Sequence, residues 1–129
     1  WKQGSPMHKH PSLKELVEAV KAFIDETAVT ELSGHAAFHA KVASNVLSTV
    51  ARELELGTDA EAEERARLVQ LLKADADTEL DQLNRDLCSR IRAGDITAST
   101  SGVVDHLKST AIAQLNIDQP RYSGAKRLR

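Results

Sequence analysis

The sequence is poor in aromatic residues, in cysteine and in long apolar runs. Aromatic residues make up 3% of its 129 residues, so any core must consist mainly of Leu, Val, Ile and Ala. The single cysteine, Cys88, excludes an internal disulfide and is typical of proteins of the cytoplasm, where we expect this one. No run of about 18 apolar residues is present, so we expect no membrane-spanning helix.

Charge of one sign is also lacking. The net charge is -2, which favours neither nucleic acid nor an anionic membrane as a partner. Charged residues nevertheless account for 28% of the chain and apolar residues for 41%, a balance that suits amphipathic helices around one modest core. A length of 129 residues is typical of a single domain.

Motifs that carry chemistry are missing as well. There is no Gly-rich phosphate loop and no G-x-S-x-G element, and the zinc motif H-E-x-x-H is absent because Ala36 follows His35. Cys88 stands inside a leucine stripe, where a cysteine is more often a small core residue than a nucleophile. We therefore expect neither catalysis nor a cofactor.

Apolar residues recur at helical spacing in five segments of the chain. Capping signals bound several of them: Ser12 with Glu15 forms a capping box, Gly57 suits a helix end, and Gly94 ends another. Thr58 with Glu61 reads as a second capping box, and Asp77 or Thr78 as a later N-cap. The predicted helices are residues 13–28, 35–56, 59–73, 79–93 and 102–116.

The sequence thus predicts an all-α, single-domain bundle of about five helices that run mostly antiparallel, over residues 12–122. We interpret the start of residues 1–11 as a cloning remnant ahead of Met7, and expect that segment to be flexible. Residues 123–129 show no pattern and are predicted to be a flexible basic tail. The predicted core of the second helix consists of Phe38, Val42, Val46, Val50 and Leu54.

The second helix also holds polar residues on or beside its apolar stripe. His35 and His39 are one turn apart, as two ligands of one metal ion would be, but the helix offers no third ligand nearby. His106 on another helix is one possible third ligand. Asn45 has two readings, a contact to a ligand or an interhelical hydrogen bond that fixes the helix register. A small ligand- or metal-binding face of His35, His39 and Asn45 is the alternative to an interaction role.

Several segments together resemble a small bacterial family of uncharacterised helical domains. They are residues 35–45, 52–57, 63–68, 87–94 and 119–122, and the last differs from the usual family pattern by having Gln119 where Asn is common. The resemblance implies genes that lie beside, or are fused to, aminoglycoside-phosphotransferase-like kinases, often near acyl-CoA dehydrogenases. It implies no established activity and no catalytic residue.

What the resemblance implies is a partner. We expect a non-enzymatic accessory domain that binds a phosphotransferase-like protein, and a homodimer is a further possibility because the Ala-rich third helix permits close packing. The residues expected at a partner- or ligand-binding site are His35, Phe38, His39, Asn45, Arg121 and Tyr122.

Overall fold

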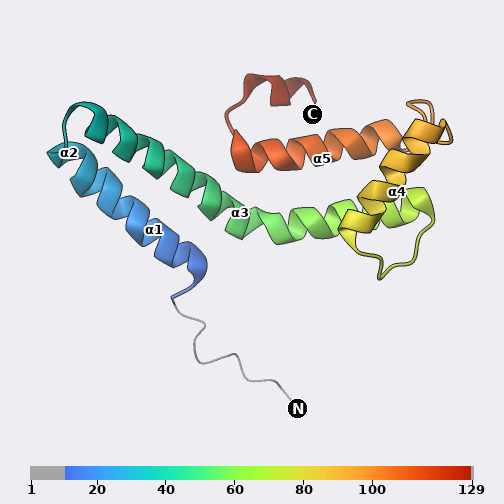
Figure 1. Ribbon diagram of the computed structural model, residues 1–129, viewed down its shortest axis with the longest axis horizontal. Coiled ribbons are helices and arrows are strands. Elements are labelled where there is room, and N and C mark those ends of the chain that lie inside the picture. The colour runs from blue at the N-terminus through green and yellow to red at the C-terminus, as the bar shows by residue number, and fades with distance from the viewer. Residues whose placement is uncertain (1–10, 129) are drawn as a thin grey trace, which may run out of the picture. The chain divides into compact units, whose positions relative to one another are not determined.

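All the regular structure in residues 11–128, the part of the chain that the computed structural model describes, is helical (Figure 1). This confirms the predicted all-α class. The expected N-terminal remnant lies, except for Pro11, outside the described residues. The elements are α1 (Leu13–Phe23), the π-helical turn η1 (Ile24–Ala28), α2 (Val29–Glu31), α3 (Gly34–Leu72), α4 (Leu80–Ala93), α5 (Val103–Asp118) and the 3-10 helix η2 (Ser123–Arg127).

The predicted second and third helices are one helix, α3, of 39 residues. The prediction of a break at Gly57 is wrong, because Gly57 is not among the residues with positive φ and the helix continues through it. A glycine inside a helix costs only about 1 kcal/mol relative to alanine, and the alanine- and glutamate-rich segment after it strongly favours helix. The described chain therefore has four helices longer than ten residues, where the sequence predicted about five.

The start of α1 follows the prediction. The Ser12 Oγ accepts a hydrogen bond from the Glu15 main-chain N–H at 3.2 Å, and the Glu15 carboxylate accepts one from the Ser12 N–H at 2.8 Å. After Phe23 the chain makes one π-helical turn, in which the Val29 N–H donates to the carbonyl of Ile24. Helical structure then ends at Glu31.

Contacts divide the described chain after Glu55, into an N-terminal unit (residues 11–55) and a C-terminal unit (residues 56–128). In the N-terminal unit α1 and the first half of α3 form an antiparallel hairpin (Figure 1). Ser44 and Ala51 are buried, and the Ser44 hydroxyl donates to the Asp25 carboxylate, so this side of α3 faces the first helix. Both residues are small, which permits close approach of the two helices.

The predicted core stripe of the second helix, now the first half of α3, is wrong. The small residues of α3 face α1, so its large apolar residues lie on other sides of the helix. The residues predicted as core, all of which are exposed, are Phe38, Val42, Val46, Val50 and Leu54.

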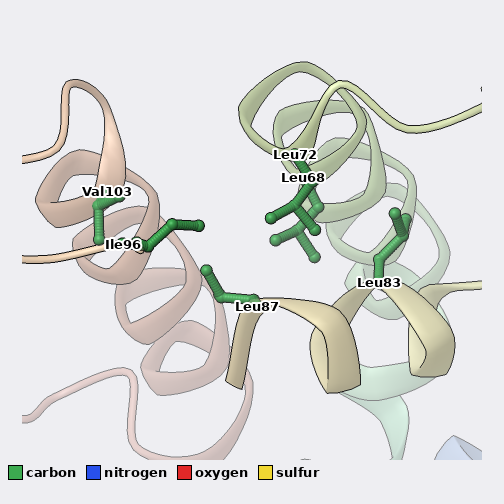
Figure 2. Packing of buried hydrophobic residues seen from close by; sticks show 6 residues of the cluster. All are labelled: Leu68, Leu72, Leu83, Leu87, Ile96 and Val103. Atoms are coloured by element: carbon green, nitrogen blue, oxygen red, sulfur yellow. The ribbon is translucent and has the colours of Figure 1, made fainter. Parts of the chain in front are cut away.

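The C-terminal unit contains the hydrophobic core (Figure 2). Leu68 is fully buried and Leu83 is 1% exposed, and they come from α3 and α4 respectively. Ile96, the large apolar residue of the loop after α4, is buried in the same cluster. The cluster consists of Leu68, Leu72, Leu83, Leu87, Ile96 and Val103.

The loop between α3 and α4 is held by Arg65. Lys73, with φ of 52°, ends α3 in the left-handed region. The Arg65 guanidinium donates through Nε to the carbonyl of Thr78 at 2.9 Å, and through a second nitrogen to the carbonyl of Ala76. The N-cap of α4 is Glu79, so the predicted cap at Asp77 or Thr78 lies too early.

The segment after Tyr122 differs from the predicted flexible tail. Residues 123–127 form η2, and Ala125 within it is buried. In α5 the buried residues are Val103, His106 and Ile117, whereas Val104 and Leu107 are exposed. No helix in residues 11–128 is both long and apolar enough to cross a bilayer.

Candidate functional site

Three of the predicted site residues lie together at the closed end of the hairpin, near the start of α3. Phe38 is 63% exposed, and its ring packs edge-on against the His39 ring, with ring centroids 5.7 Å apart. His35 and His39 are exposed as well. We name this region the tip surface and define it as Leu32, His35, Phe38, His39 and Val42, all of which are exposed.

The other three predicted site residues do not join this group in one cluster. Asn45 is exposed on α3, so the structure does not support its reading as a buried interhelical hydrogen bond. Arg121 and Tyr122 belong to the C-terminal unit and are exposed between α5 and η2. The Tyr122 ring lies over Gly124, where a Cβ atom would fall 2.7 Å from Cζ, so a side chain at position 124 would have to displace the exposed Tyr122 ring.

A metal site would require more ligands than the tip surface supplies. Among the residues that the structure describes, no group of three or more His, Cys, Asp and Glu side chains is placed to hold a metal ion. His106, the possible third ligand, is buried in the C-terminal unit and its Nδ1 accepts a hydrogen bond from Arg67. The reading of His35 and His39 as ligands therefore gains no support from the arrangement.

A second exposed apolar region runs along the side of the hairpin. On α1, Leu13, Leu16, Val20 and Phe23 are spaced by three and four residues and form one stripe. Helical geometry places this stripe, and a stripe on α3, on the side of the hairpin away from the Lys14–Glu55 ion pair. We name this region the hairpin face: Leu13, Leu16, Val20 and Phe23 of α1, and Val46, Val50 and Leu54 of α3, each of them exposed.

Charged residues occupy the opposite side of the hairpin. Lys14 lies 3.5 Å from both Glu18 and Glu55, and these two carboxylates, Glu55 first, raise its pKa above the ordinary value. Lys21 pairs with Asp25 at 2.5 Å, and hydrogen bonds from Lys21 and then Ser44 lower the pKa of Asp25. The N-terminal unit therefore has one charged side and one apolar side.

The most enclosed polar group of the C-terminal unit is His106. It is 4% exposed, and its Nδ1 accepts a hydrogen bond of 3.2 Å from the Arg67 Nε–H. Burial lowers the pKa of His106, and the Arg67 charge lowers it further against an opposing effect of Glu64. A ring nitrogen that accepts a hydrogen bond carries no proton, so this contact forms with the neutral imidazole that has its proton on Nε2.

A cavity of about 420 Å³ lies beside this pair, lined by Arg67, His106, Asp105, Ser101 and Ser109 among others. Arg67 also donates to the Thr110 hydroxyl at 3.1 Å, so its guanidinium spans two neutral acceptors on α5. The sequence did not predict the role of His106, although Val103, His106, Thr110 and Ile117 share one helical face. Counting polar as well as apolar residues at helical spacing would have placed His106 on the same face as Val103 and Ile117.

Cys88 is exposed, so its reading as a core residue is wrong. It lines an open cavity of about 560 Å³ on α4, together with Asn84, Arg85 and Arg92. The Asn84 side chain donates to the Glu64 carboxylate at 3.1 Å, which links α4 to α3 within the unit.

Comparison with known proteins gives one match. No curated protein and no solved structure matches the chain. A family model, described as a domain of unknown function (DUF6285), matches residues 30–122. The matched segment includes the tip surface, α4 and α5. It begins within α2, after α1 and η1. Since the match covers well over half of the residues, the chain belongs to the DUF6285 family of domains of unknown function.

Proposed function

We propose that this domain is a non-enzymatic accessory domain that binds another protein through the tip surface. The observation that carries the proposal is the exposure of Phe38, which has 63% of its surface accessible at the end of a helical hairpin. An exposed aromatic residue beside other apolar residues is a frequent anchor of protein interfaces. The tip surface lies within the segment that the family model matches.

The partner we propose is a phosphotransferase-like protein of the kinase fold. Support comes from the resemblance of residues 35–45 and 119–122 to domains whose genes accompany such proteins. The composition of the tip surface is suited to a protein partner, because Leu32, Phe38 and Val42 supply apolar area while His35 and His39 supply hydrogen-bonding groups at its edge.

Co-purification tests this proposal. The full chain is co-expressed with the neighbouring phosphotransferase-like protein, and the two are expected to elute together at micromolar concentration. Phe38→Ala removes the anchor and is expected to weaken the complex at least tenfold, the effect of losing an interface residue worth about 1.4 kcal/mol or more.

Lys41→Ala is the matched control, because Lys41 is also exposed on α3 but lies outside the tip surface. Its complex is expected to keep the affinity of the unmodified chain. Separate elution of the two unmodified proteins at micromolar concentration, or equal affinities of the Phe38 and Lys41 variants, contradicts the proposal.

A further inference from the structure

We infer that the hairpin face is an interface between two copies of this chain, which pair their hairpins into a four-helix bundle. The inference uses a surface other than the tip surface and goes beyond the accessory role proposed above. It rests on four properties of the hairpin face: its exposure, its residue spacing, its lack of charge and its size.

The first property is that nothing within the N-terminal unit covers the hairpin face. Leu13 is 68% exposed, Phe23 62% and Val20 53% on α1, and Val46 on α3 is 57% exposed. A two-helix hairpin has a single helix–helix contact, and here that contact uses the small residues Ser44 and Ala51. The large apolar side chains therefore lie on a side where another pair of helices is needed to bury them.

The second property is the spacing of the apolar residues on α1. Leu13, Leu16, Val20 and Phe23 follow the alternating three- and four-residue steps of helices that pack side by side in bundles. Val46, Val50 and Leu54 continue the apolar surface along the antiparallel helix. A four-helix bundle made from two such hairpins places each stripe against helices of the other copy.

The third property concerns charge. None of the seven residues of the hairpin face is charged, and the ion pairs of Lys14 and Lys21 lie on the opposite side of the hairpin. In an interface with two-fold symmetry the same surface meets itself, so charges of one sign would repel. A neutral apolar surface meets a copy of itself without repulsion and offers no charge for a partner of opposite sign to recognise.

The fourth property is the available area. At about 100 Å² of exposed surface for each half-exposed apolar side chain, the seven residues offer roughly 700 Å² per copy. A stable interface buries about 800 Å² on each partner. Exposed alanines beside the stripes, such as Ala19 and Ala43, add to this area. The hairpin face, together with these alanines, thus offers about the area that a stable dimer buries on each copy.

Light scattering coupled to size-exclusion chromatography of the full chain tests the inference. The unmodified chain is expected to have twice the 14.1 kDa mass of one chain at micromolar concentration. Val20→Glu and Val50→Glu each place a charge in the interface, and both variants are expected to return to the mass of one chain. Circular dichroism of each variant shows whether its helices remain.

Asn45→Glu is the matched control, because it adds the same charge at an exposed position of α3 outside the hairpin face. It is expected to remain a dimer. A monomeric unmodified chain overturns the inference, and so does a dimer that persists in both the Val20 and the Val50 variants. If either Val20→Glu or Val50→Glu has lost its helices, the masses of the other variant and of Leu16→Lys test the inference in its place.

The outcome is separable from that of the proposed function. A dimer lost on Val20→Glu but unchanged by Phe38→Ala supports the inference whether or not a phosphotransferase-like protein binds. Conversely, binding of that protein by a chain that is monomeric supports the tip surface as a binding site and overturns the dimer alone.

Discussion

His106 is the residue whose chemistry departs most from what its place in the sequence suggests. A histidine four residues into a helix is usually solvated, yet this one is buried and accepts a hydrogen bond from a guanidinium. A cation that donates to a neutral imidazole favours the unprotonated form, and burial acts in the same direction. The Arg67–His106 contact is therefore a stabilising interaction only while the ring is neutral.

We predict that the stability of the protein falls as the pH drops below the ordinary histidine pKa of 6.5. The folded-state pKa of His106 is lowered, so the unfolded chain binds more protons between the two values and the free energy of unfolding decreases through that range. Urea unfolding between pH 8 and about pH 5 measures it.

His106→Gln is expected to reduce this pH dependence, because the glutamine amide accepts a hydrogen bond but does not titrate. His35→Gln, at an exposed position, is expected to leave it unchanged. Equal pH profiles for the unmodified chain and the His106 variant would rule out this role for His106.

Arg65 is the second residue whose contribution follows from its contacts. Its half-buried guanidinium donates to the carbonyls of Thr78 and Ala76, in the loop between α3 and α4. We predict that Arg65→Met lowers the free energy of unfolding by about 1.5–3 kcal/mol, the size of hydrogen bonds from a charged group. Arg85→Met, at an exposed position of α4, is expected to change it by less than about 0.5 kcal/mol.

At the scale of the elements, the sequence predicted the caps at Ser12 and Gly94 correctly but not the continuity of α3. The capping box at Ser12 and the glycine end at Gly94 are both present, because each is a local hydrogen-bonding arrangement. Gly57 followed by Thr58 also looks like a helix end and a new N-cap. The chain nevertheless stays helical there, because the helix propensities of the residues in the long segment around it add up. The direction in which α3 packs was also unpredictable from apolar spacing, because Ser44 and Ala51 make the contact.

The continuity of α3 leads to a prediction for two glycines. Gly57 has helical geometry, so Gly57→Ala is expected to raise stability by about 0.5–1 kcal/mol through the better helix propensity of alanine. Gly94 has φ of 80°, and Gly94→Ala is expected to lower stability by about 1 kcal/mol. Chemical denaturation of the two variants measures both values. A loss of stability in both variants would show that the chain leaves the helix at Gly57.

At the scale of the whole molecule, the two units differ in what stabilises them. The C-terminal unit has six buried aliphatic residues in one cluster, whereas in the N-terminal unit the buried residues are Ser44 and Ala51. Leu83 and Leu87 of α4 belong to that cluster, but the predicted core residues of the second predicted helix do not. Amphipathic spacing identifies a face to be buried and does not say whether the same chain buries it.

This difference predicts unequal costs of removing leucine side chains. Leu83→Ala is expected to lower the free energy of unfolding by about 2–5 kcal/mol, as for a fully buried leucine. Leu13→Ala, at a position 68% exposed, is expected to cost less than about 0.5 kcal/mol at dilutions where the chain is monomeric. Thermal unfolding of both variants under the same conditions makes the comparison. Similar losses at the two positions would show that the N-terminal unit has a core of its own.

The π-helical turn η1 bears on which changes of chain length the helical segment from α1 to α2 tolerates. A π turn holds one residue more than an α turn, and the α-helical residues on either side of Ile24–Ala28 keep their alignment around it. Deletion of one residue from this turn would therefore yield an ordinary α-helix without rotating the residues that follow. The turn can absorb a change of one residue in chain length, so single-residue gaps belong here in any alignment of related sequences.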